Sequence, residues 1–90
     1  MDFNTTSIDL IETGKRILIA RVKAGLSVRD LQAALGLTAP NTIYKWQRGE
    51  CLPKLDHLII LSAILEVPMD DLISARIDRI DVVGEKERRG

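Results

Sequence analysis

The sequence predicts an all-α fold, a compact domain of five helices followed by a short charged tail. Apolar residues recur at helical spacing in successive segments. Glycine or proline ends these segments, at Gly25, Gly36, Gly49 and Pro68. The length of 90 residues suits one domain, and with only 3% aromatic residues the core must pack mainly through aliphatic side chains. We expect residues 13–74 to form this domain, after a partly ordered lead-in of residues 1–12.

The first helix is expected to begin near Thr13 and to end at Gly25. A start at Thr13 is favoured because Gly14 is a poor residue for the interior of a helix. The hydroxyl of Ser7 or of Thr13 is the candidate cap. The inward stripe of this helix is expected to consist of Ile17, Ala20, Ala24 and then Leu26.

Three further apolar residues of this helix, Leu18, Ile19 and Val22, fall largely off the inward stripe. That is more apolar surface than a lone surface helix needs. Two explanations stay open: the N-terminal segment covers these residues, or they form a surface for a protein partner or a second copy. The apolar residues of the N-terminal segment are Ile8, Leu10 and Ile11.

The second and third predicted helices are joined by a tight turn. Ser27 is expected to cap the second helix, with Asp30 in the position of a capping box and Gly36 as the left-handed terminator. Thr38 is expected to cap the third helix, with Pro40 in its first turn, where a missing N–H costs nothing. Small residues and a glycine at such a turn are typical of a helix-turn-helix unit, here residues 27–48.

The third helix has two unlike sides. Ile43 and Trp46 lie three apart and are expected to point into the core. The other side carries polar and cationic residues: Asn41, Thr42, Tyr44, Lys45 and Arg48. A DNA major groove accepts a helix with amide and cationic side chains after such a turn, so this pattern indicates DNA binding.

A fourth and a fifth helix are expected to complete the domain. The apolar stripe of the fourth consists of Leu55, Leu58, Ile59, Leu61, Ile64 and Leu65. Pro68 is expected to end it, and Met69–Ile73 forms a short fifth helix with an acidic start. Within the extension of residues 75–90, the spacing of three between Ile77, Ile80 and Val83 predicts a helical continuation over Ala75–Val83 that could serve association. The charged stretch Gly84–Gly90 predicts disorder.

The charge balance argues against a strongly basic nucleic-acid binder. Thirteen basic and thirteen acidic side chains cancel, and the isoelectric point is about 6.6, whereas that of such binders often exceeds about 9. The distribution is uneven, however. Leu37–His57 holds three cations against two anions, and Leu58–Ser74 holds three anions only. A weak dipole with its positive end at the helix-turn-helix is therefore expected.

Several function classes find no support in the sequence. A single cysteine, Cys51, excludes an internal disulfide and fits a reducing compartment. Cys51 and His57 alone make no zinc site, so neither a metal nor another cofactor is expected. We find no nucleophile with a plausible base, no paired carboxylates and no phosphate-binding glycine loop, and therefore expect no enzyme. No apolar run approaches ~18 residues, and we expect a cytoplasmic protein.

Leu26–Leu72 resembles the Xre-type, or Cro/CI-like, family of helix-turn-helix regulators. The residues that carry the resemblance are GLS at Gly25–Ser27, Leu31, LGL at Leu35–Leu37, TIYKWQRG at Thr42–Gly49, Pro53, and VPMDDL at Val67–Leu72. The resemblance implies a lambda-repressor-like fold of five helices in which the second and third bind DNA. It also implies a homodimer on an inverted-repeat operator, with recognition helices about one DNA turn (~34 Å) apart.

The resemblance also carries over site residues. It implies that Asn41, Thr42 and Lys45 read bases: an amide suits adenine, a lysine suits guanine, and a threonine offers its hydroxyl or methyl group. The implied phosphate contacts are Ser27, Tyr44, Arg48 and Lys54, which would fix the register on DNA.

The sequence departs from the family pattern at three points. Val28 replaces a glutamine that contacts phosphate in many members, so that contact is expected to be absent. One extra residue precedes Trp46, which makes Asn41–Arg48 the best-matched part of the reading helix. Gln47 replaces a glutamate that often pairs with an arginine in the position of Arg21. We expect Arg21 to bond Gln47 or to turn to Glu50.

Two classes of function follow. The first is a sequence-specific DNA-binding regulator, a repressor, because cations and amides share one side of the third helix. The second is a protein-interaction module of the antitoxin type with the same fold, which the neutral charge and the apolar Leu18, Ile19 and Val22 favour.

Overall fold

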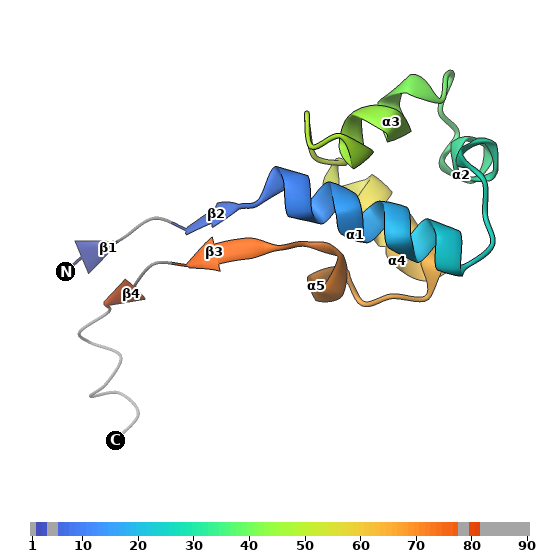
Figure 1. The fold of residues 1–90 in the computed structure, drawn as a ribbon. Coiled ribbons are helices and arrows are strands. Elements are labelled where there is room, and N and C mark those ends of the chain that lie inside the picture. Colours follow the sequence, from blue (N-terminus) through green and yellow to red (C-terminus); the bar gives the residue numbers. More distant parts are fainter. Residues whose placement is uncertain (1, 4–5, 78–79, 82–90) are drawn as a thin grey trace.

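The computed structural model describes residues 2–3, 6–77 and 80–81. In this part of the chain five helices form a compact body, and short strands from the two terminal segments extend from it side by side (Figure 1). The helices are α1 (Leu10–Lys23), α2 (Val28–Leu35), α3 (Asn41–Gln47), α4 (Leu55–Leu65) and α5 (Met69–Leu72). The predicted five-helix fold is confirmed.

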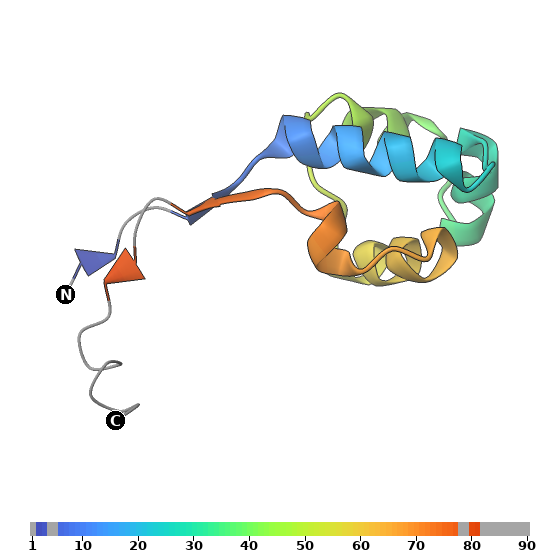
Figure 2. The ribbon, with the colours of Figure 1, turned by 60° about the horizontal axis from the view of Figure 1, so that its bottom comes forward.

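The described residues of the two terminal segments pair with each other in an arm, which the sequence did not predict. Its strands are β1 (Asp2–Phe3), β2 (Thr6–Ile8), β3 (Ala75–Ile77) and β4 (Ile80–Asp81). β2 pairs antiparallel with β3, and β1 pairs antiparallel with β4 in the same register. Figure 2 shows that the arm projects beyond the first turn of α1.

The helical continuation predicted for Ala75–Val83 is wrong for its described residues, because Ala75–Ile77 and Ile80–Asp81 are strands. Isoleucine is β-branched and suits a strand as well as a helix, so a spacing of three does not decide between the two. Pairing with the N-terminal segment decides it, because Ser7 lies opposite Arg76 and Ile8 opposite Ala75. The predicted disorder of Gly84–Gly90 lies outside the described residues.

The core of the body lies between α1, α2, α3 and α4, with α5 closing one end. The buried apolar residues are Ile17, Ala20, Val28, Leu31, Leu35, Ile43, Trp46, Leu58, Leu61, Leu65 and Leu72. Ala24, expected in the inward stripe, is instead exposed because α1 has already ended there. Leu55 and Ile59 are also exposed, whereas Leu58, Leu61 and Leu65 are buried and Ile64 packs against the core.

The first helix begins earlier than predicted, at Leu10. Asp9 is its cap, and its carboxylate accepts a hydrogen bond from the Glu12 N–H at 3.0 Å. Neither Ser7 nor Thr13 caps this helix. Thr13 is buried inside it, and its hydroxyl accepts the N–H of Ser74 at 2.9 Å. The predicted start at Thr13 was therefore wrong, because this residue lies inside α1 and bonds the segment that follows α5.

The other helix ends follow the prediction in part. Gly36 ends α2 in the left-handed conformation (φ 68°), as expected. Thr38 does not cap α3, because Pro40 holds the cap position in a helical conformation and its carbonyl accepts the N–H groups of Ile43 and Tyr44. α4 ends at a left-handed Glu66, two residues before Pro68.

The apolar residues off the inward stripe of α1 lie at the surface. Ile19 is 51% exposed and Val22 59% exposed, and Leu18 is exposed as well. Ile8 and Ile11 are themselves exposed, and the N-terminal segment runs into the arm rather than across α1 (Figure 1). Cover by the N-terminal segment is therefore the wrong explanation for these residues.

Candidate nucleic-acid interface

The third helix is fixed to the body through two buried side chains. Ile43 is fully buried and Trp46 is only 2% exposed, which confirms both as core residues. The ring of His57 on α4 lies 5.8 Å from that of Trp46, tilted by 48°. His57 is half-buried. Together these contacts hold the inner side of α3.

Gly14 explains how closely α3 approaches α1. A Cβ at this position would collide with the backbone carbonyl oxygen of Trp46 and would lie 2.8 Å from that of Gln47. Real Cβ contacts are longer, so only glycine lets the last turn of α3 lie directly on α1. The glycine that seemed unsuited to a helix interior thus sets the distance between α1 and α3.

Arg21 joins the same two helices from a position nearer the C-terminal end of α1. Its Nε donates to Gln47 Oε1 at 3.0 Å, and its Nη1 donates to the Leu26 carbonyl at 2.9 Å. The predicted bond to Gln47 is confirmed, and the alternative bond to Glu50 is wrong. Glu50 instead accepts from Arg48 Nε at 2.5 Å.

The outer side of α3 presents the candidate base-reading residues together. Asn41 and Lys45 are exposed and stand four residues apart, one helical turn, so they share one side of the helix. Thr42 is half-buried beside them. Tyr44 is 44% exposed and lies away from the core. The geometry therefore places an amide, a hydroxyl and an ammonium group on one short stretch of surface.

The candidate phosphate-binding cations lie at the C-terminal end of α3 and just beyond it. Arg48 is the C-cap of α3, and Lys54 holds the N-cap position of α4; both are exposed. The hydrogen bond with Glu50 raises the pKa of Arg48 above its usual value. The bond to Arg48 lowers the pKa of Glu50, and the charge of Lys45 adds to this effect. Glu50 therefore offsets part of the positive charge here.

The N-terminus of α2 carries a complete capping box. Ser27 Oγ accepts from the Asp30 N–H at 3.0 Å, and Asp30 Oδ2 accepts from the Ser27 N–H at 2.8 Å. The bond from the Ser27 backbone is the main reason that the pKa of Asp30 is lowered. An ionised carboxylate here repels a phosphate, while the Ser27 hydroxyl keeps its hydrogen for donation. Arg29, an exposed cation two residues after the cap, is a further candidate contact that the sequence analysis did not name.

Other sites are not supported in the described part of the chain. Cys51 is a free, exposed thiol. Among these residues no group of three or more histidine, cysteine, aspartate or glutamate side chains is arranged to hold a metal ion. None of the described helices is both long enough and apolar enough to cross a membrane.

Two helices joined at a left-handed glycine, the second with a buried inner side and a polar outer side, define a helix-turn-helix protein. The family model described as helix-turn-helix (HTH_3) matches residues 17–72, more than half of the chain. The chain therefore belongs to this family, the Xre or lambda-repressor-like class of DNA-binding transcriptional regulators. The family resemblance seen in the sequence is confirmed.

Solved structures of regulators share the fold. The restriction-modification controller protein C.AhdI from Aeromonas hydrophila is 26% identical, with a TM-score of 0.63 over 71% of this chain and 96% of that one. The P22 c2 repressor, in complex with a synthetic operator, is 30% identical, with a TM-score of 0.61 over 67% of this chain and 89% of that one.

A third structure covers more of the chain. The hypothetical transcription factor NHTF from Neisseria matches 91% of this chain and 86% of its own, with a TM-score of 0.60. Its identity of 19% shows the fold alone. A search of curated proteins found no match.

Proposed function

We propose that this protein is a repressor that binds specific double-stranded DNA sequences through the outer side of α3. The observation that carries the proposal is the division of α3, which is anchored by Ile43 and Trp46 and leaves Asn41 and Lys45 exposed on one side. A recognition helix needs both: a fixed orientation and free hydrogen-bonding groups for base edges. The 30% identity to the P22 c2 repressor, solved with a synthetic operator, supports the proposal.

The proposed roles follow from the chemistry of each side chain. Asn41 bonds an adenine through both the oxygen and the NH2 of its amide. Lys45 donates to guanine, and Thr42 contacts a neighbouring base with its hydroxyl or methyl group. Phosphates are bound by residues around this surface: Ser27, Tyr44, Arg48 and Lys54. Two copies bind an inverted repeat, with the α3 helices about one DNA turn (~34 Å) apart.

Selection from random duplex DNA tests both parts of this proposal. We expect enrichment of an inverted repeat with half-sites one helical turn apart. On the selected sequence, Lys45→Ala is expected to weaken binding by ~1–3 kcal/mol and to relax the preference at one base position. Lys23→Ala, which removes an equal charge from the end of α1, is the matched control and is expected to keep that preference. No enrichment at low salt would overturn the proposal.

The phosphate contacts have a different signature. Arg48→Ala and Lys54→Ala are each expected to weaken binding to all sequences and to reduce the salt slope by about 1. Glu50→Gln is expected to act in the opposite direction, because it weakens the bond to the Arg48 guanidinium and removes a negative charge near Lys45. Equal affinities of the wild type and Glu50→Gln for random DNA would argue against a DNA contact by Arg48.

A second candidate function, binding to a protein partner in the manner of an antitoxin, is favoured by one observation. A hollow of about 670 Å³ lies between α1 and the turn from α4 to α5, and exposed Ile19 borders it. The double variant of Ile19→Asp and Val22→Asp separates the two functions. A regulator without such a partner would keep repression and operator affinity in this variant. Lost activity in the cell with operator affinity intact would favour the partner.

A further inference from the structure

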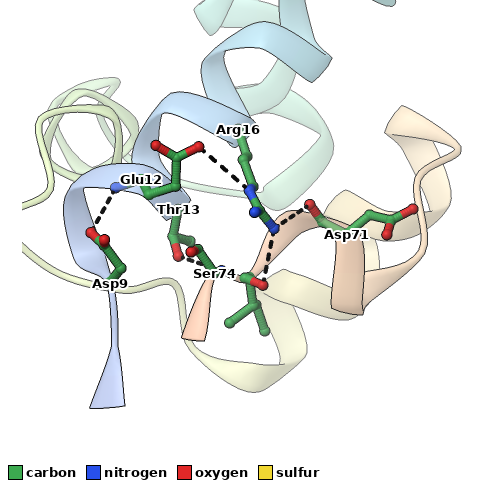
Figure 3. Close-up of polar contacts among 7 residues, drawn as sticks. Asp9, Glu12, Thr13, Arg16, Asp71 and Ser74 are labelled. Atoms are coloured by element: carbon green, nitrogen blue, oxygen red, sulfur yellow. Dashed lines mark hydrogen bonds and ion pairs between the residues drawn. The ribbon is translucent and has the colours of Figure 1, made fainter. Parts of the chain in front are cut away.

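The arm is joined to the body by hydrogen bonds at its base. Figure 3 shows the contacts around Thr13 and Arg16 on α1. Besides the bond to Thr13, Ser74 accepts the N–H of Asp9 on its carbonyl at 2.7 Å. Arg16 Nη1 donates to the carbonyls of Asp71 and Ile73, each at 3.3 Å. The direction of the first residues of the arm is therefore set by the body.

The bond between Asp9 and Ser74 also determines which backbone groups of β2 face outward. In an antiparallel pair, residues that exchange hydrogen bonds alternate with residues that do not. Asp9 bonds Ser74, and the register makes Ser7 and Arg76 the next bonded pair. Ile8 lies between them, so its N–H and C=O point away from β3. By the same alternation, the N–H and C=O of Thr6 also point outward.

Within residues 2–3, 6–77 and 80–81, no strand pairs with this outer edge of β2. In the described part of the chain, no hydrogen bond outside the strand pairing involves the N–H or the C=O of Ile8. A hollow of about 370 Å³ lies beside the edge, bordered by Ser7, Ile8 and Gly49. The side chains of Ile8 and Ile11 are 41% and 61% exposed there. An open edge flanked by apolar side chains is a template for another strand.

We propose that the outer edge of β2 pairs antiparallel with β2 of a second copy of this chain. With a twofold axis at Ser7, Thr6 of each copy lies opposite Ile8 of the other, and these are the residues whose backbone groups point outward. The small, uncharged Ser7 lies opposite its own counterpart. The result is a four-stranded sheet, whereas an isolated two-stranded ribbon is marginal in water. Such an interface is closed and self-complementary.

The other edge and other occupants fit less well. On β3 the equivalent axis would place Arg76 opposite itself, and like charges directly opposite each other destabilise a sheet. DNA is a poor occupant, because the sequence of residues 1–9 and 74–81 holds four aspartates against two arginines. The inference refines the homodimer of the proposed function by assigning it a surface.

Proline at matched positions on the two edges tests this assignment. Ile8→Pro removes an outward N–H without breaking the pairing of β2 with β3. Ala75→Pro, opposite Ile8 in the register, does the same on the outer edge of β3. In sedimentation equilibrium of the full chain without DNA, Ile8→Pro is expected to raise the dimer dissociation constant at least tenfold. Ala75→Pro is expected to leave this constant within about twofold of wild type.

Three outcomes would overturn the proposal: a wild type that stays monomeric at high micromolar concentration, an Ile8→Pro variant that dimerises like wild type, or a loss of dimer in Ala75→Pro alone. Circular dichroism verifies that both variants keep the helical body. Binding to a duplex with a single half-site, measured in parallel, separates this proposal from the proposed function. Intact half-site binding with no dimer at β2 would refute the edge pairing alone.

Discussion

The helical body and the arm are held together by different forces. In the body, apolar side chains from five helices meet in one core, and residues such as Leu31 and Leu61 are fully buried. In the arm, the ordering contacts are backbone pairs between the two ends of the chain and a few hydrogen bonds to α1. Changes of a single side chain should therefore affect the body strongly, whereas the arm should respond mainly to loss of a backbone or junction hydrogen bond.

Trp46→Ala should give the largest effect, because it removes the bulkiest side chain between α3 and the body. Truncation of a buried aromatic residue costs ~3–5 kcal/mol in stability. Urea unfolding followed by circular dichroism measures this cost. Tyr44→Ala on the same helix is the matched control, and its cost should stay within ~0.5 kcal/mol, as is usual for surface substitutions. Similar losses in both variants would contradict the assigned division of α3.

Gly14→Ala should have the next largest effect, and should damage DNA binding beyond its effect on stability. The added Cβ pushes the last turn of α3 off α1, and overpacking of this kind costs ~1–3 kcal/mol. The shift would also move Lys45 relative to the rest of the body. Lys15→Ala, at the exposed neighbouring position, is the control. A fully stable Gly14→Ala variant with unchanged half-site affinity would show that the approach of α3 is not limiting.

The difference between the body and the arm also explains which features could be predicted from the sequence. Within the body, the signals are local: Ser27 and Asp30 stand three apart, Gly36 ends a helix, and Ile43 and Trp46 share one side of a turn. Each acts through neighbours on the same helix, so the spacing along the chain is enough. The Arg21–Gln47 bond spans two helices, and it followed from the family resemblance rather than from any local pattern.

The missed features depend on contacts between distant parts of the chain. Ala75–Ile77 forms a strand because Thr6–Ile8 lies beside it, and nothing within either segment specifies the other. Gly14 was interpreted as unfavourable inside a helix. The reason for a glycine there is the close approach of the Trp46 and Gln47 carbonyls of α3, which α1 alone does not reveal. Thr13 was interpreted as a cap, since a hydroxyl near a helix start usually serves that role. Its actual partner, Ser74, is 61 residues away.

Thr13→Val should weaken the junction between the arm and the body by about 1 kcal/mol, the usual net value of one hydrogen bond. The substitution keeps the shape of the buried side chain but removes the acceptor for the Ser74 N–H. Ser74 is half-buried, so water can replace part of the lost bond. Faster hydrogen exchange of the Ser74 amide would report the effect. The exposed Thr38→Val is the control, and equal exchange in both variants would refute the junction role.

Asp30→Asn should have the smallest effect, confined to the body and dependent on pH. The capping box lowers the pKa of Asp30 below its usual value of 3.8, so the folded state binds this proton less readily than the unfolded state. The stabilisation is therefore complete above about pH 4 and is lost as the pH falls through the lowered pKa.

The stability of the wild type minus that of Asp30→Asn, measured by urea unfolding across this range, should shrink toward acid pH. A difference that stays constant with pH would mean that the charge of Asp30 adds nothing to the cap. Because the box lies within α2, far along the chain from the arm, exchange of the Ser74 amide at a pH where both proteins are folded should be equal in the two. Helix caps and the arm would then be independent, as their separate hydrogen bonds indicate.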